Sequence, residues 1–197
     1  RSLIDYLSLG YILSPKTIFK NIHRFPPASW GYIDWQNGDL TFNRYWKLED
    51  YYNLPKIDRS TRVEREEFLG IFSNAVEKRM HADVPIGAFL SSGVDSASVV
   101  ATAKSIQSNS LKAFNIGFHE DTYDEASDVE IIATELGANL ESRYFQHPSQ
   151  NDISKIVWHF DEPFSDNSAQ PMFQLSNLAS KFRKVVLSGD GADELFA

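Results

Sequence analysis

From residue 61 onward, two kinds of pattern alternate along the chain. Leu69, Phe72, Val76 and Met80 recur every three or four residues, which is the spacing of one buried face of a helix. Between helical stretches lie short runs rich in apolar and aromatic residues, as in the strands of a parallel sheet. These runs predict four strands, at residues 84–90, 112–118, 140–145 and 184–187. Because helices separate them, we expect an α/β fold with a doubly wound, mostly parallel sheet.

Capping residues mark the ends of the predicted helices. Thr61 and Glu64 have the spacing of a capping box, so they predict the start of the first helix. Asp124 is a candidate N-cap and Gly137 a stop signal for a helix that ends near residue 136. The remaining helices are predicted at residues 96–106, 153–160 and 169–182.

The first part of the chain has a different character. Residues 29–35 and 40–46 alternate polar and aromatic side chains around Asn37-Gly38-Asp39, a pattern typical of a hairpin. The polar stretch 53–59 contains a proline and is a candidate linker. We therefore expect a short β-rich segment over residues 1–57, followed by the α/β domain over residues 58–197.

Composition narrows the class of protein. The 197 residues carry 19 Lys+Arg against 27 Asp+Glu, and a net charge of −8 argues against nucleic-acid binding. The cysteine count of 0 excludes disulfides and thiolate metal sites. The longest apolar run, residues 84–90, is far shorter than the about 20 residues of a membrane helix. The chain starts at Arg1 without a signal-peptide pattern, so we expect a fragment of a longer cytoplasmic protein with no membrane partner.

A loop of small residues follows the first predicted strand. Residues 91–96 read Ser-Ser-Gly-Val-Asp-Ser and lead directly into a helix. Small side chains let a ligand approach the backbone, Gly93 can adopt a positive φ, and the free N–H groups of a helix start attract anions. Ser91, Ser92 and Ser96 add hydroxyl donors. The loop has the features of a phosphate-binding loop, although the lysine of a Walker loop is absent.

Asp95 is the unexpected residue of this loop, because a carboxylate repels phosphate. A Mg²⁺ ion resolves the conflict by bridging carboxylate and phosphate oxygens. The alternative is a serine-rich helix start in which Asp95 acts only as a cap. The first loop by itself leaves both interpretations open.

A second loop follows the fourth predicted strand. Residues 188–194 read Ser-Gly-Asp-Gly-Ala-Asp-Glu, and acids this dense beside a buried strand are costly unless a cation or substrate uses them. Ligands bind beyond the carboxyl ends of parallel strands, so both loops share one crevice if the first and fourth strands are neighbours. Asp95 and Asp193 would then share one Mg²⁺. The alternative is a solvated acidic turn.

The two loops together carry a family resemblance. Residues 91–96 resemble the SGGxDS pyrophosphate loop of the ATP pyrophosphatases, with Ser92 in place of a glycine. LSGDGADELF, residues 187–196, resembles the second signature of the glutamine-hydrolysing asparagine synthetases. FDEPFSDNSAQP, residues 160–171, is similar to a family segment at the mouth of the site. Residues 10–30, with Arg44-Tyr45-Trp46 later, look like the end of the family's glutaminase domain.

The resemblance implies a fold and a reaction. The fold is that of the PP-loop, adenine nucleotide α-hydrolase-like proteins. Residues 1–57 would be the C-terminal end of a glutaminase domain and a linker, and residues 58–197 the N-terminal half of a synthetase domain. The reaction would be the ATP-dependent synthesis of asparagine from aspartate through β-aspartyl-AMP, releasing AMP and pyrophosphate. Ammonia would come from glutamine, and a homodimer of the full-length protein stays open.

The resemblance also assigns roles to residues of both loops. Pyrophosphate would be bound by the first loop, through Ser91, Ser92, Gly93, Asp95 and Ser96. Mg²⁺ would be held by Asp95 and Asp193, and Asp190 would lie near the intermediate. These three aspartates are the catalytic candidates. Adenine and ribose would lie against Phe89, Leu90, Ile116, Ser188 and Gly189.

Two alternative functions stay open. Related amide-forming enzymes that act on another carboxylate share both motifs, and a non-catalytic module that only binds ATP would share the fold. The family continues well beyond residue 197, so we expect the fragment alone to be inactive. Asp161, Glu162 and Asp166 are further candidates at the mouth of the site, with a capped acidic turn as their alternative interpretation.

Overall fold

The computed structural model describes residues 1–56, 60–107, 111–119 and 125–196 of the chain. Its contacts define two compact units. The N-terminal unit comprises Arg1–Arg59 and Ser154–Asp166, and the sheet unit comprises Ser60–Ile153 and Asn167–Ala197. Residues 154–166 therefore belong with a part of the chain that is far away in sequence.

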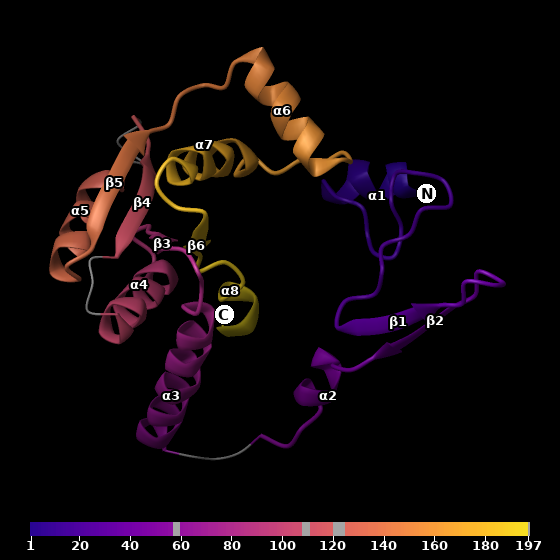
Figure 1. Cartoon of the computed structure of the whole chain (residues 1–197), viewed down its shortest axis with the longest axis horizontal. Helices are drawn as coiled ribbons and strands as arrows, with labels where there is room; N and C mark the ends of the chain where they lie inside the picture. Colours follow the sequence, from indigo (N-terminus) through magenta and orange to yellow (C-terminus); the bar gives the residue numbers. More distant parts are fainter. Residues whose placement is uncertain (57–59, 108–110, 120–124, 197) are drawn as a thin grey trace. The chain divides into compact units, whose positions relative to one another are not determined.

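The sheet unit is built on four parallel strands (Figure 1). They are β3 (Ile86–Phe89), β4 (Lys112–Gly117), β5 (Asn139–Tyr144) and β6 (Val185–Leu187). Their order in the sheet is β5-β4-β3-β6, and the register pairs Gly87 of β3 with Lys112 of β4 and with Val186 of β6. The parallel sheet predicted from the sequence is thus confirmed; β3, β4 and β6 are shorter than predicted, and β5 is shifted by one residue.

In the described part of the chain from residue 60 onward, six helices precede, connect or follow these strands, and most of α6 belongs to the N-terminal unit. They are α3 (Thr61–Arg79), α4 (Val94–Ile106), α5 (Ala126–Glu135), α6 (Gln150–Phe160), α7 (Ala169–Ser180) and α8 (Asp193–Phe196). Gly137 follows α5 with φ +63°, which confirms it as a stop signal. The expected N-cap Asp124 lies outside the described residues.

Three local expectations are wrong. The N-cap of α3 is Ser60 rather than Thr61, and the carbonyl of Ser60 accepts the N–H of Glu64 at 3.2 Å. Helix α4 begins at Val94, two positions before the predicted start at Ser96. Gly93 has φ −67° and ψ 144°, so this N-cap residue uses an extended conformation that does not require glycine.

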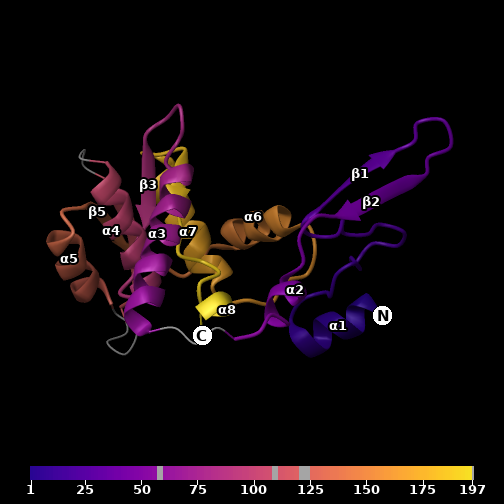
Figure 2. The same ribbon diagram turned by 90° about the horizontal axis from the view of Figure 1, so that it is seen from below.

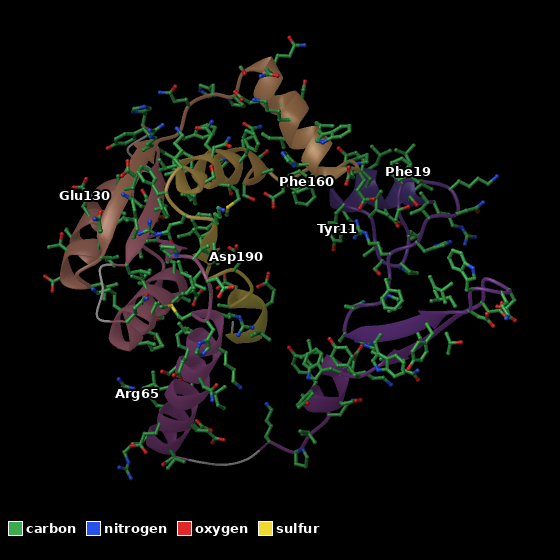
Figure 3. The ribbon with its side chains drawn as sticks, viewed as in Figure 1. Tyr11, Phe19, Arg65, Glu130, Phe160 and Asp190 are labelled. Atoms are coloured by element: carbon green, nitrogen blue, oxygen red, sulfur yellow. The ribbon has the colours of Figure 1, made fainter. Side chains whose placement is uncertain are left out.

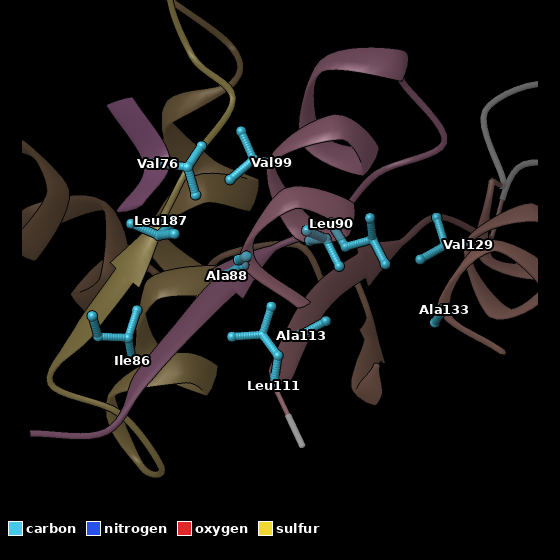
Figure 4. Close-up of a cluster of buried hydrophobic side chains, with 12 residues drawn as sticks. Val76, Ile86, Ala88, Leu90, Val99, Leu111, Ala113, Val129, Ala133 and Leu187 are labelled. Atoms are coloured by element: carbon cyan, nitrogen blue, oxygen red, sulfur yellow. The ribbon is translucent and has the colours of Figure 1, made fainter. Parts of the chain in front are cut away.

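Helices cover both faces of the sheet because alternate strand residues point to opposite sides. On one face, Ala88, Ala113 and Leu187 pack against residues of α3, α4 and α5, including Val76, Val99 and Val129 (Figure 4). On the other face, the buried Phe114 packs against Leu178 and Ala179 of α7. Figures 1 and 2 show α4 and α7 on either side of β3 from two directions. The fold is therefore the doubly wound α/β arrangement that the sequence predicted.

The strand order creates a switch point between β3 and β6. The chain moves outward from β3 through β4 to β5, and then returns to the other side of β3 as β6. In open parallel sheets, ligands bind beyond the carboxyl ends of strands at such a point. The condition for a shared crevice, that the first and fourth strands are neighbours, is met.

The N-terminal unit contains the expected hairpin. Strands β1 (Ser29–Ile33) and β2 (Leu40–Arg44) pair antiparallel, and Gly38 adopts φ +76° in the turn that joins them. Two short helices, α1 (Ser2–Leu9) and α2 (Leu48–Tyr52), were not predicted. Across the residues that the structure describes, no helix combines the length and the apolar character needed to cross a membrane.

The segment after α6 is attached to the start of the chain within the N-terminal unit. Glu162 forms an ion pair with Arg24 and accepts the backbone N–H of Ile18 at 3.3 Å. The N–H of Ser165 donates to the carbonyl of Gly10 at 2.9 Å. Glu162, a candidate for the mouth of the site, is therefore engaged in structural contacts in this unit.

Candidate functional site

The two motif loops line a single cavity at the carboxyl ends of β3 and β6. It has a volume of 590 Å³. The residues predicted for the site that line it are Phe89, Leu90, Ser91, Gly93, Asp95, Ser96, Ile116, Ser188, Gly189, Asp190 and Asp193. These residues come from β3, β4, α4 and the turn after β6, so the tertiary structure brings together positions about 100 residues apart in the sequence.

Two serines brace the first loop from inside. The N–H of Ser91 donates to the Ser96 Oγ at 3.0 Å, and the two hydroxyl oxygens are 2.8 Å apart. The N–H of Gly93 donates to the Ser91 Oγ at 3.2 Å. Ser96 is buried, so its hydroxyl serves the loop itself in this structure. The bracing fixes the strand-to-helix turn and leaves the first N–H groups of α4 without partners inside the helix.

The second loop approaches the first closely at Gly189. A Cβ atom on this residue would lie 2.8 Å from the backbone nitrogen of Ser96 and 3.0 Å from the carbonyl carbon of Asp95. A glycine is therefore required for the two loops to touch. Sequence reasoning placed Gly189 in the site but did not foresee this packing role.

Local hydrogen bonds orient Asp190. Its backbone N–H donates to the Ser188 Oγ at 3.0 Å, and that hydroxyl donates to the Asp190 carboxylate. Gly191 follows with φ +90°, a conformation that favours glycine. The turn thereby presents the carboxylate at the cavity; Figure 3 labels Asp190 on the loop after β6.

The floor and one wall of the cavity contain residues that sequence reasoning missed. Asn115, buried in β4, donates its side-chain amide to the carbonyl of Leu90 at 2.9 Å and accepts the hydroxyl of Ser142 at 3.1 Å. A polar residue inside an apolar strand was the available signal. The wall is one face of α7 and its start, formed by Ser168, Pro171, Met172 and Leu175. Ser168 and Pro171 belong to the segment 160–171 that the family resemblance put at the mouth of the site, whereas Met172 and Leu175 were missed because helical spacing does not say what a helix face packs against.

Asp95 and Asp193 line the same cavity from opposite loops. Within the described residues, no group of three or more His, Cys, Asp or Glu side chains lies close enough to hold a metal ion by itself. Two carboxylates nevertheless suit Mg²⁺, which is commonly bound by one or two carboxylates with substrate phosphates and water completing the shell. The donor set thus fits a Mg²⁺ ion that enters together with a phosphate ligand.

Ser92 departs from the expected arrangement, since it is not among the described residues that line the cavity. Its N–H donates to the carboxylate of Glu125 at 3.3 Å, and its hydroxyl donates to the same oxygen. Glu125 is the N-cap residue of α5. Its contact with the loop had no signal in the sequence, because 33 positions separate the two residues.

The fold and cavity define an α/β protein whose candidate ligand site lies at the switch point of a parallel sheet. A family model described as asparagine synthase matches residues 67–197, which make up most of the chain. The chain therefore belongs to the asparagine synthase family.

Relatives in the family align along nearly the whole chain. One relative comes from Methanocaldococcus jannaschii, and its name includes the words asparagine synthetase. It is 38% identical over 193 residues, which are 97% of this chain and 36% of the relative. The glutamine-hydrolyzing asparagine synthetase 1 of Bacillus subtilis is 34% identical over 196 residues, covering 99% of this chain and 30% of that protein. The chain thus spans about a third of the length of these relatives.

Among solved structures, the NH3-dependent NAD synthetase of Campylobacter jejuni resembles the chain with a TM-score of 0.43 at 16% identity. The similarity covers 66% of this chain and 58% of that structure, and it is too limited to carry a functional argument.

Proposed function

We propose that the chain forms the ATP-binding part of an amide-forming ligase that makes asparagine from aspartate within a longer protein. The observation that carries the proposal is the convergence of the two loops, because a serine-braced helix start and four carboxylates, those of Asp95, Asp190, Asp193 and Glu194, line one cavity. Family membership and the names of the relatives support the same reaction.

In this proposal, the first loop binds the phosphates of ATP. The N–H groups at the start of α4 and the helix dipole favour an anion there. Phe89, Leu90 and Ile116 provide an apolar surface beside the loop, and Ser188 and Gly189 provide backbone groups. These are suitable contacts for an adenine ring and its ribose.

Asp95 and Asp193 hold Mg²⁺ in this proposal. When bound, the ion offsets the negative charge of the phosphates beside the carboxylates. The role of the chain's own residues is to place these carboxylates on facing loops, with Gly189 allowing the loops to touch. Asp190 would act near the intermediate, and its place in the cavity and its hydrogen bond from Ser188 support this role.

The proposed chemistry requires no side-chain nucleophile. A carboxylate oxygen of aspartate attacks the α-phosphorus of ATP, forming β-aspartyl-AMP while the bond to pyrophosphate breaks. Ammonia then attacks the activated carbonyl carbon, loses a proton and displaces AMP. Catalysis by positioning and charge stabilisation is sufficient for the first step, which agrees with a chain that contains 0 cysteines.

The ammonia is proposed to come from glutamine, hydrolysed by a glutaminase domain whose C-terminal end is residues 1–57. Residues 58–197 would then be the N-terminal half of the synthetase domain. The chain covers only 30% of the Bacillus subtilis relative, which agrees with further parts being needed. We expect the 197-residue chain alone to release no pyrophosphate.

The test is pyrophosphate release by the complete protein supplied with ATP, Mg²⁺, ammonia and aspartate. Asp95→Ala should abolish release, whereas Asp128→Ala, on the exposed side of α5, should retain it. Release with a different carboxylate but not with aspartate would reassign the substrate. Binding of ATP without release for any carboxylate would contradict the proposal and favour a non-catalytic module.

A further inference from the structure

Glu125 contacts the first loop, residues 91–96, although it lies at the start of α5. Its carboxylate accepts both the N–H and the hydroxyl of Ser92, in the turn that leads into α4. Its own carbonyl accepts the N–H of Val129 at 2.9 Å and so belongs to the first turn of α5. Helix α5 in turn packs on the sheet through Val129 and Ala133. The backbone at one end of this contact therefore belongs to a helix that is packed on the sheet.

The contact completes the internal hydrogen bonding of the loop. The N–H groups of Ser91 and Gly93 are used by the Ser96 and Ser91 hydroxyls, and the N–H of Ser92 is used by Glu125. An incoming phosphate is then directed to the first N–H groups of α4, which have no partners within the helix. The position of Ser92 thus decides how the loop presents the start of α4.

We propose that Glu125 is a positioning residue that holds Ser92, and with it the loop, in the shape that receives the phosphates of ATP. The inference rests on the proposed function for its ligand. A serine at position 92 matters because its hydroxyl gives Glu125 a second donor that glycine lacks. Holding the loop before the ligand arrives removes an ordering cost from binding, so the effect falls on affinity for ATP.

Steady-state kinetics of the complete protein test this role. Glu125→Ala should raise the KM for ATP about fivefold with a smaller change in kcat, the factor expected for one hydrogen bond of ordinary strength. Glu125→Gln, which keeps an acceptor oxygen, should recover part of the loss. The matched control is Glu130→Ala, an exposed acid further along α5 that should leave both parameters unchanged (Figure 3). A lower KM in Glu125→Gln would overturn the proposal, because it would mean that the carboxylate competes with phosphate.

A double-mutant cycle tests whether Glu125 acts through Ser92. Glu125→Ala should cost less in a Ser92→Gly background than in the wild type, since the hydroxyl contact is already lost there. Equal effects in both backgrounds would mean that Glu125 acts elsewhere, and would refute the assignment.

Amide hydrogen exchange without ATP separates this inference from the proposed function. Residues 91–96 should exchange faster in Glu125→Ala than in the wild type, while Glu130→Ala should leave them unchanged. Unchanged exchange in Glu125→Ala would overturn the inference even if the wild type releases pyrophosphate. Faster exchange in a protein that releases none would keep the loop-holding role and reject the proposed function.

Discussion

The backbone of Gly189 lies directly against the backbone of Ser96. A Cβ atom at position 189 would be 2.8 Å from the Ser96 nitrogen, closer than real Cβ atoms come to any neighbour. The neighbouring atoms are backbone and have no rotamer by which to move away. Contact between the loop after β6 and the start of α4 therefore depends on the absence of a side chain at this position.

Gly189→Ala should push the two loops apart. We expect a loss of about 1–3 kcal/mol in the free energy of unfolding, as for other overpacked sites, and a raised KM for ATP. Gly70→Ala is the matched control, because nothing lies within 4 Å of a Cβ at this position in α3. It should instead gain about 0.5–1 kcal/mol, as alanine is the better helix former. Urea unfolding distinguishes the two, and a neutral Gly189→Ala would contradict the close packing.

Asn115→Asp should destabilise the floor of the cavity. The aspartate cannot donate to the Leu90 carbonyl at pH 7 and would place its negative charge beside it. We expect a loss of about 1–3 kcal/mol in the free energy of unfolding. Ser142→Ala removes only the second partner of Asn115 and should cost about 0.5–1.5 kcal/mol. Equal losses of unfolding free energy in the two variants would contradict a larger contribution from the hydrogen bond to Leu90 than from the one to Ser142.

Asp193→Asn should weaken the use of Mg²⁺. If Asp193 shares the ion with Asp95, the Mg²⁺ concentration that gives half-maximal pyrophosphate release should rise about tenfold or more at saturating ATP. Glu135→Gln, an exposed acid on α5, is the control and should leave the Mg²⁺ dependence unchanged. An unchanged dependence in Asp193→Asn would remove this residue from the proposed metal site.

Glu162→Ala should release the segment after α6 from the start of the chain. The substitution removes the ion pair with Arg24 and the acceptor for the Ile18 N–H, and the Glu162 side chain is only 16% exposed. Limited proteolysis should cleave residues 1–25 and 154–166 faster than in the wild type. The control is Glu49→Ala, which removes the more exposed ion pair with Arg44. The pKa of the Glu49 carboxyl is lowered below its ordinary value, first by a backbone hydrogen bond and then by Arg44. Water reaches both side chains and makes the ion pair weak, so we expect no change in the cleavage of these segments.

Local patterns were sufficient to predict the hairpin, the four parallel strands, their longer helices and both loops, but not the short helices α1 and α2. The apolar spacing of Leu69, Phe72 and Val76 predicts a helix wherever that helix packs, and Gly137 ends a helix because of its own backbone freedom. The small and acidic residues at 91–96 and 188–194 likewise stand out from their own chemistry. The positive φ considered for Gly93 was wrong, because contacts with neighbouring residues influence the backbone conformation there. The Gly93 N–H donates to the Ser91 hydroxyl, and the residue adopts the extended conformation of an N-cap.

Contacts between distant residues were decided only by the tertiary structure. The neighbours of β3 depend on how helices pack on both faces of the sheet, so the pairing of Ala88 with Leu187 is not encoded in either strand alone. The same holds for Ser92 with Glu125, and for Glu162 with Ile18 across 144 positions. Sequence periodicity indicates which face of an element is apolar, but not what covers it: Leu69, on the apolar face of α3, is 50% exposed, whereas Val76 is buried. The residues that supply the candidate chemistry could therefore be predicted from the sequence. That they line one cavity depends on the strand order β5-β4-β3-β6, which makes β3 and β6 neighbours.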